Sequence, residues 1–231
     1  MPETESENNI LEHSELPSVR MTLRGDAQEI FHSLWASLFF SGHGAGKSVM
    51  VSSIGQQEGA TTVASALALA GSLPAGSERV ALVDLNFRSP ALHRVMGLEQ
   101  NLGVSEMVLD GVAPEIAAQS VTPGLDVFAA GGGSQRLLEI LRSTALRGVL
   151  ESLASKYDRV LVDVPAANAY PDAQMVAAIV KDTVLVVRAD QTPREAVAMA
   201  KKRIESAGGR VVGVILNMRT YPIPKFLYNR V

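Results

Sequence analysis

Short apolar runs rich in β-branched residues alternate with helical segments along most of this chain, and this alternation constrains the fold more than any other feature. Most runs are apolar at consecutive positions, which is typical of strands covered on both faces. Strands that alternate with helices form right-handed βαβ crossovers and a mainly parallel sheet. The sequence therefore predicts an α/β fold, a three-layer sandwich with a mainly parallel central sheet. The predicted strands are Ser48–Ser53, Val80–Asp84, Leu125–Ala129, Arg159–Asp163, Thr183–Arg188 and Val211–Asn217.

The 231 residues divide into one main domain, residues 21–217, with a segment on either side. Residues 1–20 carry five glutamates and no sustained apolar period, so we expect a mobile acidic arm. In Asp26–Phe40 the apolar residues recur at spacings of three and four, which predicts an amphipathic helix. Residues 218–231 are expected to form a C-terminal tail.

Composition excludes several classes of protein. The chain has no cysteine, which excludes a disulfide framework, thiolate catalysis and Cys-held zinc or iron–sulfur clusters. Its formal charge of −3 removes the electrostatic case for a nucleic-acid binder. We find neither a run of about 20 apolar residues nor a signal peptide. The four histidines lack ligand spacing, so no metal other than nucleotide-bound Mg²⁺ is expected.

Two glycine-rich segments compete for the role of a phosphate loop. The first, Gly42–Ser48, contains Gly46-Lys47-Ser48, which resembles the end of a phosphate-loop motif. However, it follows a predicted helix and precedes a predicted strand. A phosphate loop must run from a strand into a helix, because the anion binds the N-terminal amides of that helix. We therefore interpret this segment as a connector whose Lys47 is solvated.

The second candidate lies between the strand that ends at Ser53 and a helix predicted over Thr61–Leu73. It reads Gly55-Gln56-Gln57-Glu58-Gly59-Ala60-Thr61-Thr62. The context is that of a phosphate loop, but Ala60 stands where G-x-x-x-x-G-K-[ST] has its lysine. Thr61 remains at the position of the Mg²⁺-binding hydroxyl. The alternative is an ordinary strand-to-helix turn with a threonine cap.

Two predicted strands end in carboxylates. Asp84 ends one strand and begins Asp84-Leu85-Asn86-Phe87-Arg88, while Asp163 ends another and begins Asp163-Val164-Pro165. Carboxylates at the carboxyl ends of parallel strands, beside a phosphate loop, are placed to handle Mg²⁺ and an attacking hydroxyl.

With these three motifs in this order, the sequence resembles the bacterial tyrosine kinases (BY-kinases), the cytoplasmic modules of capsule and exopolysaccharide export machines within the MinD/ParA-like deviant P-loop class. The resemblance covers roughly residues 26–217. It implies ATP or ADP with Mg²⁺ as cofactor and Asp84, Asn86 and Asp163 as catalytic residues. Thr61, Asp84 and Asp163 would hold Mg²⁺. The implied nucleotide-binding residues are Gly55, Glu58, Gly59, Ala60, Thr61, Thr62, Arg88 and Asn217. For Asn217, a strand-end cap is an equal alternative to a purine contact.

The departures from the family pattern fall on residues with chemical tasks. Ala60 removes a cation, and one charge-assisted hydrogen bond corresponds to about 10- to 150-fold in binding. Asn86 replaces a carboxylate and cannot readily take a proton. Lys47 cannot substitute, because a six-residue strand of about 20 Å separates it from the loop. Arg88 is the better candidate for residual charge, with a structural pairing to a carboxylate as the alternative.

Two further departures concern assembly. The family's E-x-x-R-x-x-R subunit-contact motif is replaced by Glu29, His32 and Trp35, and Trp35 can equally be a core residue. Members of the family also end in a tyrosine cluster, whereas this tail offers Tyr221 and Tyr228 only. The resemblance implies an inner-membrane polysaccharide co-polymerase, or chain-length determinant, as partner, and a homo-oligomer is also considered.

We therefore predict a degenerate BY-kinase-like pseudokinase that supports polysaccharide biosynthesis and export. Its nucleotide binding would be weak or absent, and it would lie in the cytoplasm at the inner face of the inner membrane, held there by its partner. The alternative is an active tyrosine autokinase or ATPase with a non-standard phosphate-binding cation. A positioning ATPase of the ParA/MinD kind is less favoured, because the net charge is acidic and no basic amphipathic C-terminal helix is present.

Overall fold

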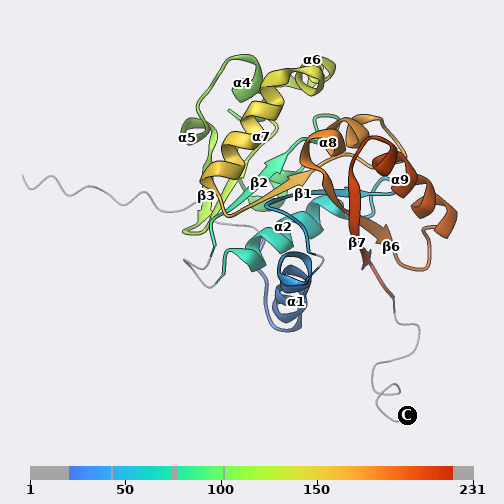
Figure 1. Cartoon of the computed structure of the whole chain (residues 1–231). Helices are drawn as coiled ribbons and strands as arrows, with labels where there is room; N and C mark the ends of the chain where they lie inside the picture. The colour runs from blue at the N-terminus through green and yellow to red at the C-terminus, as the bar shows by residue number, and fades with distance from the viewer. Residues whose placement is uncertain (1–20, 43, 74–77, 101, 221–231) are drawn as a thin grey trace, which may run out of the picture.

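A computed structural model describes residues 21–42, 44–73, 78–100 and 102–220 of the chain. Its centre is a seven-stranded sheet with the strand order β3-β4-β2-β5-β1-β6-β7 (Figure 1). All neighbouring strands are parallel except β3 and β4. The strands are β1 (Ser48–Ser53), β2 (Val80–Asp84), β3 (Gln119–Thr122), β4 (Leu125–Phe128), β5 (Arg159–Asp163), β6 (Asp182–Arg188) and β7 (Arg210–Asn217).

Helices cover both faces of the sheet, so the predicted three-layer α/β sandwich is confirmed. One face packs on α1 (Asp26–Phe40), α2 (Ala60–Gly71) and α3 (Leu92–Met96). The other face packs on α4 (Val104–Leu109), α5 (Pro114–Ala117), α6 (Leu137–Arg142), α7 (Thr144–Lys156), α8 (Asp172–Val180) and α9 (Arg194–Ser206), with a short 3₁₀ helix, η1 (Gly133–Arg136), before α6. Within the described residues, no helix is both long and apolar enough to cross a membrane.

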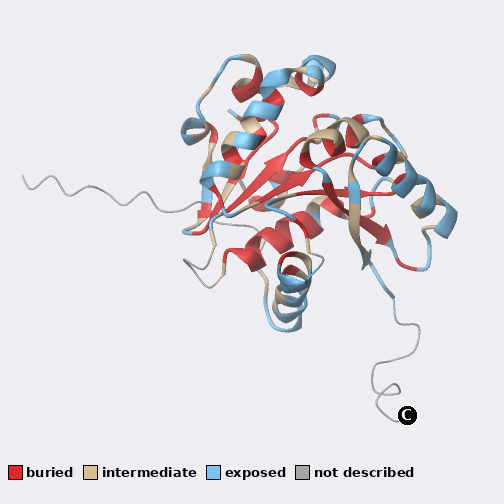
Figure 2. Ribbon diagram, in the orientation of Figure 1, coloured by how far each residue is buried: buried red, intermediate tan, exposed pale blue. Residues whose placement is uncertain are grey.

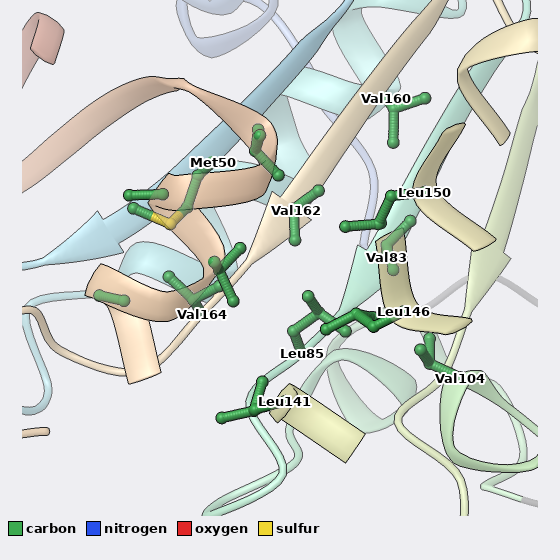
Figure 3. Packing of buried hydrophobic residues seen from close by; sticks show 14 of the residues in the cluster. Met50, Val83, Leu85, Val104, Leu141, Leu146, Leu150, Val160, Val162 and Val164 are labelled. Atoms are coloured by element: carbon green, nitrogen blue, oxygen red, sulfur yellow. The ribbon is translucent and has the colours of Figure 1, made fainter. Parts of the chain in front are cut away.

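The central strands β1, β2 and β5 are buried except at the first residues of β1 and β5 (Figure 2). Successive side chains of a strand point to opposite faces, so each strand contributes to two cores. Val83 and Val162 belong to the core under α4 to α9, where Figure 3 shows them among other aliphatic side chains. Leu82 and Leu161 belong to the core under α1 and α2. This double burial is the reason that the strands read as continuous apolar runs.

The elements predicted by range agree with the structure apart from their ends, and one strand was omitted. The helix over Asp26–Phe40 and three of the strands have the predicted bounds. The helix predicted from Thr61 begins one residue earlier and ends at Gly71. The omitted strand is β3, an edge strand with the burial pattern intermediate, exposed, buried, intermediate. A short, half-exposed, antiparallel strand carries no continuous apolar run, and this explains the omission.

The segment between α1 and β1 is a connector, as predicted. Its Gly46 amide donates to Asp182 Oδ2 at 2.7 Å, and Arg210 pairs with the same carboxylate. Lys47 lies at the amino end of β1, where its exposed Nζ donates to the carbonyl of Ala154 at 3.2 Å. The amide that would have bound a phosphate thus binds a carboxylate of the chain itself.

Candidate functional site

A cleft lies at the carboxyl ends of the central strands and has a volume of about 480 Å³. Ser53 at the end of β1, Asn86 just beyond β2 and Pro165 just beyond β5 all line it. Open α/β sheets bind ligands at this edge. The lining residues are Ser53, Gln56, Gln57, Gly59, Ala60, Thr61, Asn86, Arg88, Ser89, Ala91, Val164, Pro165, Ala166 and Tyr170.

The loop from β1 into α2 has the strand-to-helix geometry of a phosphate loop. Gly59 precedes the first residue of α2 and has φ of +86°, a conformation that favours glycine. A Cβ on Gly59 would also lie 2.4 Å from Asn217 Nδ2. Asn217 Nδ2 itself donates to the carbonyl of Glu58 at 2.9 Å. Asn217 therefore anchors the loop from the end of β7.

Glu58 organises the same loop from within. Its Oε2 accepts from the amides of Ile54 at 2.9 Å and Gly55 at 3.1 Å. Its Oε1 accepts from the hydroxyl of Thr192 at 2.6 Å. Glu58 is buried and does not line the cleft. The carboxylate thus contacts the protein's own amides, and the prediction that Glu58 contacts nucleotide remains untested.

The two strand-end carboxylates meet beneath the cleft. Asp84 and Asp163 are directly paired in the register of β2 and β5, and both are fully buried. Because side chains alternate along a strand, both point to the face that α2 covers, where Leu82 and Leu161 also lie. Thr61, in the first turn of α2, donates from Oγ1 to Asp163 Oδ2 at 2.7 Å. The sheet therefore assembles the three predicted Mg²⁺ ligands.

Burial makes this pair of carboxylates bind protons tightly. Desolvation raises the pKa of Asp84 to about 6, although backbone amides of Asn86 and Leu92 oppose the shift. Desolvation, followed by the charge of Asp84, raises the pKa of Asp163 well above its ordinary value. The hydrogen bond from Thr61 opposes this second shift. Two carboxylates side by side in low dielectric cannot both ionise without cost.

The donor set fits a magnesium ion. Asp163 Oδ1 is buried and has no hydrogen-bond partner among the described residues, so a polar atom is left unsatisfied next to Thr61 and Asp84. Two carboxylates and a hydroxyl are the hard oxygen ligands that Mg²⁺ prefers. A bound cation would also favour the charged form of both carboxylates and so oppose the desolvation that raises their pKa values.

The lysine position of the loop holds no cation. Ala60 is the first residue of α2, lines the cleft and is 8% exposed. Lys47 does not line the cleft, as expected from its place at the opposite end of β1. Among the described lining residues, the only charged side chain is that of Arg88.

Arg88 takes the structural role that the sequence offered as an alternative. Its Nε and Nη2 donate to the two carboxylate oxygens of Asp172 at 2.7 and 2.9 Å. Asp172 is fully buried at the start of α8. The guanidinium also lies 4.2 Å from the ring centroid of Tyr170. Arg88 is thus both an ion-pair partner and a cation at the wall of the cleft.

The remaining predicted site residues lie around the cleft in different ways. Asn86 lines it, and its Oδ1 accepts from the amide of Ser89 at 3.2 Å. Gly55 lies in the loop and Thr62 lies in α2, and neither lines the cleft. Thr62 is exposed. Tyr221 and Tyr228 lie outside the described residues.

Gln56 and Tyr170 are among the cleft residues that sequence reasoning did not assign to the site. Gln56 Nε2 donates to Tyr170 Oη at 3.1 Å, which links the phosphate loop to the segment before α8. Gln56 lay inside the predicted loop without an assigned role. Tyr170 belongs to none of the three motifs, so no signal in the sequence assigned it to the site.

The arrangement can be compared with known proteins. The family profile described as "Cellulose biosynthesis protein BcsQ" matches residues 47–207. The tyrosine-protein kinase YwqD of Bacillus subtilis is 30% identical over 172 residues, which cover 74% of this chain and 72% of that protein. The chain belongs to the BcsQ family by its profile match and to the BY-kinase family by its likeness to YwqD.

Solved BY-kinase domains share the fold. The chimerical protein CapA2B2 has a TM-score of 0.77 and 26% identity over 84% of this chain and 85% of its own. The kinase domain of the Escherichia coli tyrosine kinase ETK has a TM-score of 0.76 and 26% identity over 86% of this chain and 79% of its own. Cobyrinic acid a,c-diamide synthase from Mycobacterium smegmatis, solved with ADP and magnesium, shares 18% identity at a TM-score of 0.62 and shows the fold alone.

The chain matches unequal parts of its BY-kinase relatives. It is 30% identical to CapB of Staphylococcus aureus over 137 residues, covering 60% of that protein and 59% of this chain. It covers only 20% of the tyrosine-protein kinase ptk of Acinetobacter johnsonii, at 27% identity over 64% of this chain. The likeness therefore concerns the domain built on the seven-stranded sheet.

Proposed function

We propose that this chain is a degenerate BY-kinase, a pseudokinase that supports polysaccharide biosynthesis and export through a membrane co-polymerase partner. The observation that carries the proposal is Ala60. The loop, the helix and the carboxylates expected of a phosphoryl-transfer site lie together, but no lysine stands at the loop's cation position. Phosphoryl transfer depends on cations that stabilise charge as it develops. A site without that lysine retains its shape and loses most of its catalytic power.

In this proposal, the residues present still fit a nucleotide with Mg²⁺, bound weakly if at all. Thr61, Asp84 and Asp163 would hold the ion, and Asn86 and the loop amides would orient the phosphates. A bound Mg²⁺ supplies charge neutralisation at the phosphate oxygens. Asn86 cannot serve as a base, because a carboxamide does not accept a proton near neutral pH.

The partner and the location belong to the same proposal. BY-kinases act in polysaccharide systems, and the family profile matched by the chain is named for cellulose biosynthesis. We propose that an inner-membrane chain-length determinant, or co-polymerase, holds the protein at the cytoplasmic face of the membrane. The protein would act there by its shape and contacts rather than by turnover.

A second candidate is an active tyrosine autokinase of the same system. The observation in its favour is that Arg88 brings a cation to the cleft while the carboxylate pair and Thr61 are retained. In this alternative, Tyr221 and Tyr228 would be the acceptors.

Genetic complementation separates the two candidates. We expect deletion of the gene to lower surface polysaccharide, and both the wild type and Asp84→Asn to restore it equally. Asp84→Asn keeps the size of the side chain and removes the charge. Equal protein abundance should be checked by immunoblotting. Phosphotyrosine at Tyr221 or Tyr228, lost together with polysaccharide in Asp84→Asn, would contradict the pseudokinase proposal and support the active kinase.

A further inference from the structure

One wall of the cleft is formed by the segment that joins β5 to α8, which carries Tyr170, and Arg88 from the loop after β2 lies against this tyrosine. Tyr170 is the only aromatic residue and Arg88 the only charged residue among the described residues that line the cavity. Both side chains therefore offer recognition chemistry that the small and amide side chains of the phosphate loop do not.

Arg88 is held in a fixed orientation. The carboxylate of Asp172 accepts two of its N–H groups at 2.7 and 2.9 Å, and the ring of Tyr170 stacks on the guanidinium with its centroid 4.2 Å away. Tyr170 and Asp172 flank Pro171, so one turn of the chain holds the cation from two sides. A guanidinium has five N–H groups, and those not bonded to Asp172 have no acceptor among the described residues. Arg88 is thus preorganised to donate into the cleft.

The hydroxyl of Tyr170 also has an unused donor. Its oxygen accepts from Gln56 Nε2 at 3.1 Å, and accepting a bond leaves the hydroxyl hydrogen available. No acceptor for that hydrogen occurs among the residues that the structure describes. The bond from Gln56 also places the hydroxyl next to the phosphate loop. The cleft therefore presents a phenolic O–H and guanidinium N–H groups that lack partners.

We propose that Tyr170 and Arg88 form a phosphate-recognition pair, in which both donate to the terminal phosphate of a nucleoside diphosphate. The pair compensates in part for the cation that Ala60 lacks. This inference rests on the proposed function only in placing a nucleotide in the cleft, and it requires no turnover. Charge-assisted hydrogen bonds from a preorganised guanidinium are well suited to a phosphate group.

Isothermal titration calorimetry with Mg·ADP, pyrophosphate and adenosine tests the pair. Tyr170→Phe keeps the ring on Arg88 and removes the hydroxyl, so the affinity for Mg·ADP and pyrophosphate should fall about fivefold. The affinity for adenosine should not change, because it has no phosphate. Arg88→Lys loses the planar guanidinium, with its fixed N–H groups and its stacking on Tyr170. Its affinity for Mg·ADP should fall about tenfold.

Tyr157→Phe is the matched control. This variant also loses one hydroxyl, which in the wild type donates to Asp126 at 2.7 Å. Tyr157 does not line the cleft. The variant's affinity for Mg·ADP should equal that of the wild type. Thermal unfolding of each variant confirms that it is folded.

Equal affinities of wild type and Tyr170→Phe for Mg·ADP would overturn the inference. So would the absence of binding of Mg·ADP and pyrophosphate to the wild type at millimolar concentrations, although the pseudokinase proposal would survive that result because it needs no nucleotide. Conversely, rapid ATP turnover that falls in Tyr170→Phe would contradict the pseudokinase proposal and leave the recognition pair intact.

Discussion

The side chains beneath the cleft form a charge arrangement that costs stability unless a cation or a proton is bound. Asp84 and Asp163 are neighbours in adjacent strands, and both are fully buried. Neither has an ion-pair partner among the described residues. Arg88 is paired with Asp172 instead. The protein therefore keeps a costly pair of buried carboxylates, and such pairs are concentrated at functional sites.

This arrangement predicts how stability depends on pH. The pKa of Asp84 is raised from 3.8 to about 6, and that of Asp163 is also raised. A raised carboxyl pKa contributes stability that is complete below the ordinary pKa and is lost as pH rises through the raised one. Without metal, we expect the free energy of unfolding to fall from pH 5 to pH 8.

Asp163→Asn should weaken this dependence on pH. The variant cannot ionise at this position, so its loss of stability between pH 5 and pH 8 should be smaller than that of the wild type. Urea denaturation at several pH values, with a chelator present, measures the difference. Asp190→Asn, at an exposed position, serves as the control and should follow the wild type. Parallel profiles for wild type and Asp163→Asn would contradict the raised pKa of Asp163.

Glu58 should be a determinant of stability as well as of loop shape. Glu58→Ala leaves the amides of Ile54 and Gly55 and the hydroxyl of Thr192 without their acceptor. Unpaired buried donors cost about 1–3 kcal/mol each, so we expect a loss of about 2–4 kcal/mol, because water reaches part of the loop. Glu151→Ala, on an exposed face of α7, should change stability by less than about 0.5 kcal/mol. Chemical denaturation of both variants provides the comparison.

Among the helices, α1 packs on the rest of the domain through Trp35, which stands where the family's subunit-contact motif has an arginine. Trp35 is buried, and its Nε1 donates to Glu78 Oε2 at 3.0 Å. Its ring centroid lies 4.4 Å from that of Phe39. Arg159 completes the cluster by pairing with Glu78. Trp35 is thus a core residue, and α1 uses it for packing on its own chain.

The close approach of α1 to α2 depends on Gly71. A Cβ at Gly71 would lie 2.3 Å from the indole ring of Trp35. Gly71→Ala should therefore force the ring to move and lower the free energy of unfolding by about 1–3 kcal/mol.

Gly148→Ala, in α7, is the matched control for this substitution. A Cβ there would meet nothing within 4 Å, so alanine should stabilise the helix by about 0.5–1 kcal/mol. Thermal denaturation monitored by circular dichroism should show shifts of opposite sign. A stabilising Gly71→Ala would contradict the tight contact between α1 and α2.

Elements that are buried on both sides were predictable, whereas half-exposed ones were not. Continuous apolar runs revealed β1, β2 and β5 with their bounds, because helices cover both faces of these strands. β3 remained hidden, since its alternation of exposed and buried residues extends over four positions only. The short helices between α3 and α7 lack enough turns to show a period.

At the scale of the whole molecule, parallel topology explains which part of the site could be predicted. Asp84, Asp163 and Thr61 end strands or begin a helix, so a parallel sheet must bring them to one edge. Asp172 lies 84 positions after its partner Arg88, and Tyr170 lies 114 positions after its partner Gln56. No motif spacing records such contacts, so Asp172 and Tyr170 became visible only in the fold.

In our proposal, this protein has a phosphate-binding framework without the loop's cation, because Ala60 stands at the lysine position. Calorimetric titration of the wild type and Ala60→Lys with Mg·ATP measures the effect of that cation, because a lysine at this position would extend into the cleft that Ala60 lines. We expect weak or undetectable binding to the wild type and affinity about 10- to 150-fold higher in Ala60→Lys. Tight binding to the wild type, with turnover and no gain in Ala60→Lys, would contradict this proposal.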